Sequence, residues 1–246
     1  MPCGQRTALI TGSGQNIGRA IALHLAKAGF NVVINGSAKR DACEAVAGEA
    51  REAGVDALVA MGDIGDRAAV HGVAEAALNE FGRVDVLVNN AAVRPDGGFL
   101  EMSEDEWNRV LSINFNAPFW LSRACLPGMV ENGWGRIINF TGMNAQQGYA
   151  GKPHVTVSKH AVWGLTKTLA KEFGRKGVTT NIISPGTIVG EAAGHSASAQ
   201  ERLLAANPSA RLGHPDDIAC LVDLLVSDGG SFINGQLLQV NGGVVT

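Results

Sequence analysis

The sequence has few of the residues that build a disulfide framework or a zinc site. Its four cysteines, Cys3, Cys43, Cys125 and Cys220, are scattered over 246 residues without a CxxC pair or a close histidine partner. This spacing argues against a disulfide framework and against a metal site. It predicts four reduced thiols, as in a cytoplasmic protein.

Charge and long apolar runs are also scarce. Charged residues make up 17% of the chain, the net charge is −3 and the sequence pI is about 6.1, so no basic field for a nucleic acid is present. No uncharged apolar run approaches the ~20 residues that span a membrane, and no signal-peptide pattern precedes the first predicted strand. We therefore expect a cytoplasmic protein with neither nucleic acid nor membrane as partner.

What the chain does contain is a regular alternation of short apolar runs and amphipathic stretches. Continuous apolar runs of this length are typical of strands buried on both faces, and their alternation with helices predicts a parallel sheet. We expect one Rossmann-type, doubly wound, three-layer α/β domain over residues 1–246, with a seven-stranded parallel sheet. The predicted strands are Thr7–Ile10, Val32–Ile34, Ala57–Ala60, Val84–Val88, Arg136–Phe140, Thr180–Ile183 and Leu237–Val240, and the predicted helices are 17–28, 41–53, 66–80, 104–131, 155–173 and 215–227.

Several helix ends carry local signals. The segments 41–44 (Asp-Ala-Cys-Glu) and 103–106 (Ser-Glu-Asp-Glu) have the spacing of capping boxes at two helix starts. Glycine just beyond a helix adopts the left-handed conformation at little cost, which predicts four helix ends at Gly29, Gly54, Gly82 and Gly174.

A glycine-rich turn, Thr11-Gly-Ser-Gly-Gln-Asn-Ile-Gly18, joins the first predicted strand to the first predicted helix. Glycines let the backbone approach a pyrophosphate closely, and a helix N-terminus offers free N–H groups and a positive dipole. Because the turn opens a βαβ unit, it predicts a dinucleotide-binding site.

The spacing of this turn resembles the TGxxxGxG pattern of the short-chain dehydrogenase/reductase family. The likeness continues through Asp63-Ile64, Asn89-Asn-Ala-Ala92, Ile113-Asn114, Ser158-Lys159, Ser184-Pro-Gly186 and Asn234-Gly-Gln236 through Gly242-Gly243. Asn16 and Ala92 stand where the family has glycine. The resemblance implies cofactor contacts at Gly12, Ser13, Gln15, Asn16, Ile17, Gly18, Asp63, Ile64, Asn90, Ala91, Lys159, Pro185, Gly186 and Thr187.

The end of the second predicted strand bears on which nicotinamide dinucleotide is bound. An acidic residue there would bind the ribose 2′-hydroxyl and repel a 2′-phosphate. By alignment with the family this position is Gly36, and Ser37, Lys39 and Arg40 follow it. The absence of a carboxylate beside two cations predicts a preference for NADP(H), with NAD(H) as the alternative.

The chain departs from the family where proton chemistry is expected. The resemblance implies a catalytic serine, tyrosine, lysine and asparagine. Asn114 and Lys159 match, but the tyrosine position holds Val155 and the serine position holds Gly142. The chain's single tyrosine, Tyr149, lies six residues before the expected site. Loss of a positioned general acid typically costs about 10²–10⁴-fold in rate.

Three interpretations remain open. In the first, the protein reduces a small carbonyl, enone or imine substrate by an atypical proton route. Tyr149 or His154 would be the acid, Lys152 would lie beside them, and Thr141 would supply the missing hydroxyl. In the second, the protein binds the cofactor as a non-catalytic subunit or a sensor. In the third, the scaffold catalyses a non-redox lyase or dehydratase step.

Two features bear on substrate and assembly. Residues 190–207 are small and mostly neutral, which is typical of a mobile lid over a small-molecule substrate, and we expect Arg94 and Phe99 to border the pocket. The helix at 104–131 and the one that begins near Val155 are apolar on more than one side. The resemblance implies that these helices form a dimer interface, so we expect a homotetramer, or failing that a dimer.

Overall fold

The computed structural model describes residues 5–189 and 197–246, which form a seven-stranded sheet in the order β3-β2-β1-β4-β5-β6-β7. Every neighbouring pair is parallel. This arrangement confirms the predicted Rossmann-type α/β fold. The strands are β1 (Thr7–Ile10), β2 (Asn31–Gly36), β3 (Ala57–Met61), β4 (Val86–Asn89), β5 (Gly135–Phe140), β6 (Val178–Pro185) and β7 (Leu237–Val240).

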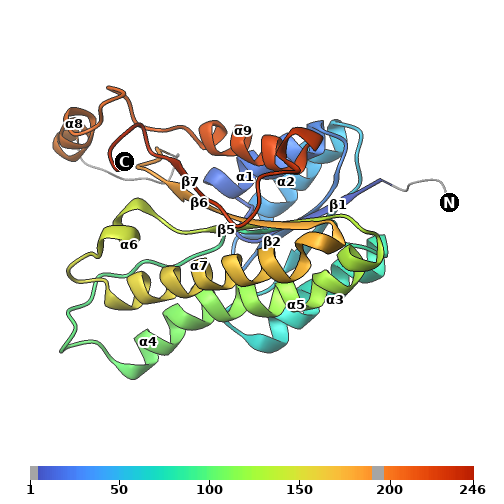
Figure 1. Ribbon diagram of the computed structural model, residues 1–246, viewed down its shortest axis with the longest axis horizontal. Helices are drawn as coiled ribbons and strands as arrows, with labels where there is room; N and C mark the ends of the chain where they lie inside the picture. Colours follow the sequence, from blue (N-terminus) through green and yellow to red (C-terminus); the bar gives the residue numbers. More distant parts are fainter. Residues whose placement is uncertain (1–4, 190–196) are drawn as a thin grey trace.

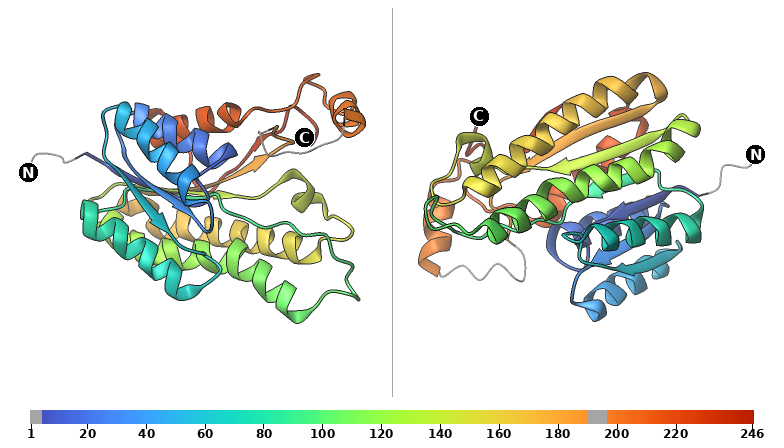
Figure 2. Two further views of the ribbon diagram at one scale, coloured as in Figure 1. Left: turned by 180° about the vertical axis from the view of Figure 1, so that it is seen from behind. Right: turned by 90° about the horizontal axis from the view of Figure 1, so that it is seen from below.

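Helices cover both faces of the sheet. Helices α1, α2 and α9 form one layer, and α3, α4, α5 and α7 lie across the other face (Figure 1). Helix α8 stands apart from both layers, near the chain's C-terminal end (Figure 2). The helices are α1 (Asn16–Lys27), α2 (Arg40–Glu52), α3 (Arg67–Phe81), α4 (Glu104–Leu111), α5 (Ala117–Glu131), α6 (Met143–Gln147), α7 (Pro153–Phe173), α8 (Ala197–Ala205) and α9 (Pro215–Val226).

The strands read as continuous apolar runs because both of their faces are buried. In β1, Ala8 and Ile10 pack into the core beneath α1, α2 and α9. Leu9, between them, points to the opposite core beneath α3 and α5. Successive side chains of a strand alternate between faces, so a strand covered on both sides needs apolar residues at every position.

The order of the strands creates a crevice at one edge of the sheet. Strand β1 pairs with β2 on one side and with β4 on the other, so the chain reverses its direction of winding there. Ligands of open α/β sheets bind at the carboxyl ends of the strands beside such a switch point. The glycine-rich turn and the loops after β4, β5 and β6 all leave the sheet at this edge, on the left in Figure 1.

The helix expected over 104–131 is interrupted. It consists of α4, a π-helical turn at Ser112–Asn116 and α5. A π turn adds one residue without breaking the apolar periodicity, so the sequence pattern does not reveal it. Two short helices, α6 and α8, were also not expected. Of the lid expected at 190–207, residues 190–196 lie outside the described residues, and α8 is part of the remainder.

Two of the expected helix-end signals are wrong. Helix α2 begins at Arg40, its N-cap is Lys39 and no side chain caps it, so Asp41 lies inside the first turn rather than at the cap. Gly174 has a right-handed φ of −57°, and a 3₁₀ turn continues to Lys176 before Gly177 takes the left-handed conformation. Gly29, Gly54 and Gly82 have positive φ as expected.

The other predicted capping box is half formed. Ser103 Oγ accepts a hydrogen bond from the Glu106 amide at 3.1 Å, which caps α4. The Glu106 carboxylate bonds His154 Nε2 at 3.0 Å. The Glu106 carboxylate therefore holds α4 against the start of α7 and does not complete the capping box.

Candidate active site

The glycine-rich turn has the geometry that a pyrophosphate needs. Gly12 has a φ of +63°, and Asn16, where the family has glycine, has a φ of +50°. Asparagine tolerates this left-handed region better than most residues. A Cβ on Gly18 would lie 2.3 Å from the Gly12 carbonyl oxygen, so only glycine fits there. Helix α1 has no side-chain cap at Gln15, which leaves the first N–H groups of the helix free.

Polar side chains from neighbouring strands hold this turn in place. Ser13 Oγ donates to the Ile10 carbonyl and accepts from the Asn35 amide at 2.8 and 3.0 Å. Asn90 Nδ2 donates to the carbonyl oxygens of Thr11 and Gly12. Ser13 and Asn90 therefore shape the backbone of the dinucleotide site through these bonds.

A cavity of about 280 Å³ opens beside the turn, at the carboxyl ends of β1, β4, β5 and β6. We call it the central cavity. Seven of the predicted cofactor residues line it, namely Asn16, Ile17, Asn90, Lys159, Pro185, Gly186 and Thr187. Its other walls are Arg94, Phe140, Thr141, Gly142, Met143, Ala145, Tyr149, Lys152, Val155, Thr156 and Ile188.

A second hollow, of about 220 Å³, lies on the α2 side of the turn. Gly12, Gln15, Ser37 and Lys39 from the predicted cofactor set line it, and Lys39 Nζ reaches Gln15 Oε1 at 3.5 Å. Arg40 does not line it and forms an i,i+4 ion pair with Glu44 instead. Lys39 is therefore the better placed of the two predicted cations.

Sequence reasoning missed Cys43, which also lines this hollow. A Cβ built on Gly36 would lie 2.6 Å from its sulfur, so the thiol occupies the space beside the end of β2. A cysteine on a helix gives no sequence signal of such a contact.

Several predicted cofactor residues lie outside both hollows. The Asp63 carboxylate accepts hydrogen bonds from Arg109 of α4 at 2.6 Å and from the Gly65 amide at 2.9 Å. The hydrogen bond from Arg109 is the main reason that the pKa of Asp63 is lowered. Ile64 is buried in the core beneath α3 and α5. Ser13, Gly18 and Ala91 shape the turn without lining either hollow.

Lys159, on α7, lies at the floor of the central cavity. It is 3% exposed, and its Nζ donates to the Phe140 carbonyl at 2.9 Å. Burial, and secondarily the positive charge of Arg94, lower the pKa of Lys159 to about 7. Near neutral pH this side chain is therefore present in both protonation states.

Asn114 lies in the π-helical turn and is 1% exposed. Its Oδ1 accepts from the Val93 amide at 2.9 Å, and its Nδ2 donates to the Val93 carbonyl and to Ser158 Oγ. It does not line the central cavity. Asn114 ties the loop after β4 to α7, a positioning function, and π turns of this kind recur at functional sites.

The two positions that lack the family's proton donors face the central cavity. Val155 lines it from the first turn of α7, and Gly142 lines it after β5. A Cβ on Gly142 would meet nothing within 4 Å, and its backbone is extended. The cavity therefore has room for a side chain at this position.

The predicted substitutes for the missing tyrosine are placed very differently. Tyr149 is half exposed at the cavity wall, and Thr141 lines the cavity beside Gly142. His154 is fully buried, bonds Glu106 and does not line the cavity. Of the two loop residues expected to border the pocket, Arg94 lines the cavity and Phe99 lies exposed at another hollow.

Comparison with known proteins assigns the fold to a family. The profile of the enoyl-(acyl carrier protein) reductase family matches residues 12–245. The 3-oxoacyl-[acyl-carrier-protein] reductase FabG of Staphylococcus aureus is 36% identical over 240 residues, 97% of this chain and 98% of its own. The chain belongs to the short-chain dehydrogenase/reductase family. Membership places it among oxidoreductases that use a nicotinamide dinucleotide.

Two further relatives support this assignment. The (2S)-[(R)-hydroxy(phenyl)methyl]succinyl-CoA dehydrogenase subunit BbsD of Thauera aromatica is 38% identical over 245 residues, 97% of this chain and 96% of its own. The crystal structure of acetoin dehydrogenase YohF from Salmonella typhimurium superposes with a TM-score of 0.91 at 31% identity, covering 98% of this chain and 96% of the other.

The residues of this short-chain dehydrogenase/reductase fit a dinucleotide cofactor. No side chain caps the start of α1, so its first N–H groups are free to bind a pyrophosphate. Asn16 Oδ1 is a buried atom without a hydrogen-bond partner among the described residues, on a residue that lines the central cavity. Such an atom is expected to find its partner in a ligand. The two hollows on either side of the turn would take the two ends of the dinucleotide.

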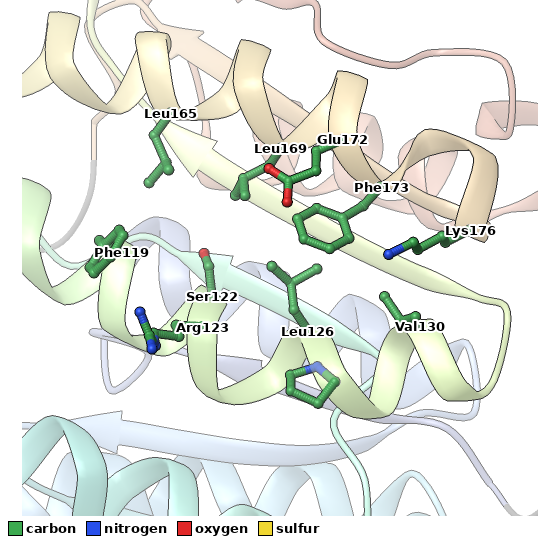
Figure 3. Close-up of a pocket in the computed structure, with 11 residues that line it drawn as sticks. Phe119, Ser122, Arg123, Leu126, Val130, Leu165, Leu169, Glu172, Phe173 and Lys176 are labelled. Carbon is green, nitrogen blue, oxygen red and sulfur yellow. The ribbon is translucent and has the colours of Figure 1, made fainter.

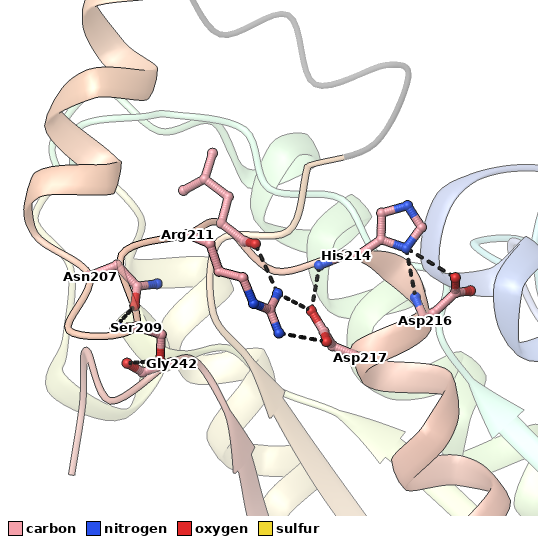
Figure 4. Close-up of polar contacts among 8 residues, drawn as sticks. Asn207, Ser209, Arg211, His214, Asp216, Asp217 and Gly242 are labelled. Carbon is pink, nitrogen blue, oxygen red and sulfur yellow. Dashed lines mark hydrogen bonds and ion pairs between the residues drawn. The ribbon is translucent and has the colours of Figure 1, made fainter.

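Residues 211–217 form a segment with several ion pairs and hydrogen bonds. This segment supports the part of the central-cavity wall that follows β6, at Thr187 and Ile188. The Arg211 guanidinium bonds both carboxylate oxygens of Asp217 at 2.6 and 2.8 Å, and Asp217 also accepts from the His214 amide (Figure 4). The hydrogen bond from Arg211 is the main cause that lowers the pKa of Asp217 to about 2. Gly213, within this segment, forms a bridge with Ile188 beside Thr187.

The described residues form neither a metal centre nor a membrane-spanning helix. In residues 5–189 and 197–246, no group of three or more histidine, cysteine, aspartate or glutamate side chains is arranged to hold a metal ion. No helix in the same part of the chain is long and apolar enough to cross a membrane.

Proposed function

We propose that the protein is an NADP(H)-dependent reductase of a small carbonyl, enone or imine compound, with Lys159 as its proton source. The observation that carries the proposal is the floor of the central cavity, where Lys159 has a pKa of about 7 while Gly142 and Val155 supply no proton. A general acid with a pKa near the working pH is the most effective one.

The mechanism follows from what this chain's residues do. When bound, the nicotinamide supplies a hydride to the electrophilic carbon of the substrate. Thr141, beside the empty serine position, offers a hydroxyl to the substrate oxygen or nitrogen. The Lys159 ammonium delivers the proton and returns to the Phe140 carbonyl as a neutral amine. An iminium or a conjugated carbonyl would suit this site, because it demands little protonation at the moment of hydride transfer.

The preference for NADP(H) is part of the proposal. Neither aspartate nor glutamate is among the described residues that line the hollow on the α2 side, whereas Lys39 and the hydroxyl of Ser37 are. A 2′-phosphate would meet a cation and a donor there, and no carboxylate would repel it.

The first experiment follows NADPH consumption by absorbance over a panel of ketones, aldehydes, enones and imines, between pH 5.5 and pH 9. We expect turnover of a subset, with kcat falling as the pH rises through about 7, because the ammonium form of Lys159 is then lost. Tyr149→Phe should keep most of the activity and the same pH profile. A loss of about 10²-fold or more in Tyr149→Phe would make Tyr149 the acid and reject Lys159.

A restored variant gives the matched comparison. Gly142→Ser with Val155→Tyr returns the two missing groups to positions that face the cavity, and the space beside Gly142 accepts a side chain. If only this double variant consumes NADPH, the natural chain is a cofactor-binding subunit or sensor. The relative BbsD, which is described as a subunit of a dehydrogenase, is one reason to keep this second candidate.

We also propose that a second copy of the chain covers the face formed by α5 and α7. A groove of about 530 Å³ runs between these helices, with Leu126, Leu165, Leu169 and Phe173 along it (Figure 3). Arg123, Glu172 and Lys176 border it, so opposite charges can meet across a twofold axis. This face would form the dimer, and a homotetramer would need a second interface.

A further inference from the structure

The central cavity has an excess of positive charge. Three cations, Arg94, Lys152 and Lys159, are among its lining residues, and none of the described residues that line it is an aspartate or a glutamate. A cleft lined by one sign of charge concentrates ligands of the opposite sign. The three cations differ in how available they are to a ligand.

Lys152 is already engaged. Its Nζ lies 3.1 Å from Asp96 Oδ1 and donates to the Arg94 carbonyl at 3.2 Å. These contacts pin the loop after β4 to the start of α7 and balance the charge of Lys152. They also fix the backbone of Arg94, which limits where its side chain can reach.

Lys159 is engaged as well. It is buried at the floor and bonded to the Phe140 carbonyl. Arg94 differs from both, because among residues 5–189 and 197–246 its guanidinium has no hydrogen bond or ion pair, and burial alone lowers its pKa. A planar guanidinium with five N–H donors and no protein acceptor matches a carboxylate in a two-bond fork.

We propose that Arg94 binds a carboxylate of the substrate, so that the central cavity takes a small oxo acid rather than a neutral carbonyl compound. The carboxylate lies against Arg94 after β4, and the reacting carbon lies toward Thr141, Gly142 and Lys159. The bound anion also offsets the repulsion between Arg94 and the Lys159 ammonium, which keeps the proton on Lys159 until it is needed. The choice of a carbonyl compound rests on the proposed function, but carboxylate binding does not require turnover.

The test measures binding without catalysis. The protein saturated with NADP⁺ cannot donate a hydride, so a series of 2-oxo to 5-oxo acids and their methyl esters is titrated into it by calorimetry at pH 7. At least one acid should bind about 10- to 100-fold more tightly than its ester. Arg94→Gln should reduce this ratio to about one, Arg94→Lys should keep part of it, and Arg51→Gln, an exposed arginine that bonds the Ala57 carbonyl, should leave it unchanged.

Three results would overturn the proposal. One is that no acid binds more tightly than its ester. Another is that Arg94→Gln keeps the preference for the acid. The third is that Arg94→Gln weakens NADP⁺ binding as much as it weakens acid binding, which would place Arg94 on the cofactor. If an acid binds through Arg94 but no panel compound consumes NADPH, the carboxylate site stands and the proposed reductase activity fails.

Discussion

Replacing Lys159 with methionine should stabilise the ligand-free protein at neutral pH, by an amount that depends on pH. The pKa of this lysine falls from 10.5 to about 7 in the folded protein, chiefly because the ammonium is buried. At about 1.4 kcal/mol per pKa unit, the difference of 10.5 − 7, about 3.5, corresponds to a cost of ~5 kcal/mol when both states are protonated.

The stability depends on pH because the folded and the unfolded chain bind different numbers of protons. Below about pH 7 both the folded and the unfolded chain carry the proton, so the full cost is present. Between pH 7 and pH 10 the unfolded chain binds more protons than the folded one, so the free energy of unfolding rises with pH. Over this interval the wild type should gain ~3–4 kcal/mol relative to Lys159→Met.

The net effect at pH 7 also includes a lost hydrogen bond. Methionine fills a similar volume but leaves the Phe140 carbonyl without its donor, at a cost of about 1 kcal/mol. We therefore expect Lys159→Met to be more stable than wild type by ~2–4 kcal/mol at pH 7 and to lose this advantage by pH 10. Urea unfolding at pH 7, 8, 9 and 10, at one protein concentration, measures it.

A control on the same helix separates burial from charge removal. Lys171 is exposed on α7, and Lys171→Met should show no such dependence on pH. If the difference between wild type and Lys159→Met changes by less than about 1 kcal/mol between pH 7 and pH 10, the reasoning about a costly buried ammonium is refuted.

Three other variants test separate parts of the molecule. Wild type should bind NADPH more tightly than NADH, and tighter binding of NADH would refute the assignment of NADP(H). Gly36→Asp should reverse the preference only together with Cys43→Ala, because the Cys43 sulfur blocks a side chain at residue 36. Leu165→Glu in the α5/α7 groove should yield monomers by light scattering, and an unchanged mass would exclude this face as an interface. Asp217→Asn should lower Tm by about 2–4 °C at pH 7. Wild type should lose this extra stability as the pH falls from about 4 to about 2, so the two proteins should melt alike at pH 2. Equal melting curves at pH 7 would show that the pair of Asp217 with Arg211 contributes nothing to stability.

Much of the architecture follows from local chemistry that sequence displays directly. Strands with apolar residues on both faces, such as Ala8, Leu9 and Ile10, can only be buried between two layers of helices. The glycine-rich turn was predictable because its backbone demands leave few choices of residue at Gly12 and Gly18. The gaps at Gly142 and Val155 were visible because the family spacing to Lys159 is fixed along one helix and one loop.

The sequence-based predictions that were wrong or incomplete concern contacts that only the tertiary structure determines. His154 is adjacent to Val155 in sequence, yet it is buried against Glu106, 48 residues earlier, because neighbouring positions on a helix point in different directions. Asp63 is occupied by Arg109, which comes from α4. The open guanidinium of Arg94 could not be told from any other loop arginine until its surroundings were known.

The π-helical turn at Ser112–Asn116 makes the protein unusually sensitive to a change of chain length in that segment. A deletion of one residue would let the turn relax into an ordinary α-helix, because a π turn holds about one more residue than an α turn, and α4 and α5 would keep nearly the same relative orientation. Asn114 would then leave its place on the wide turn and its bonds to Val93 and Ser158. An added residue would instead rotate α4 by about 100° and separate Glu106 from His154. Relatives of this chain should therefore keep both the length of residues 112–116 and the buried asparagine within them, while the other residues of the turn vary more readily.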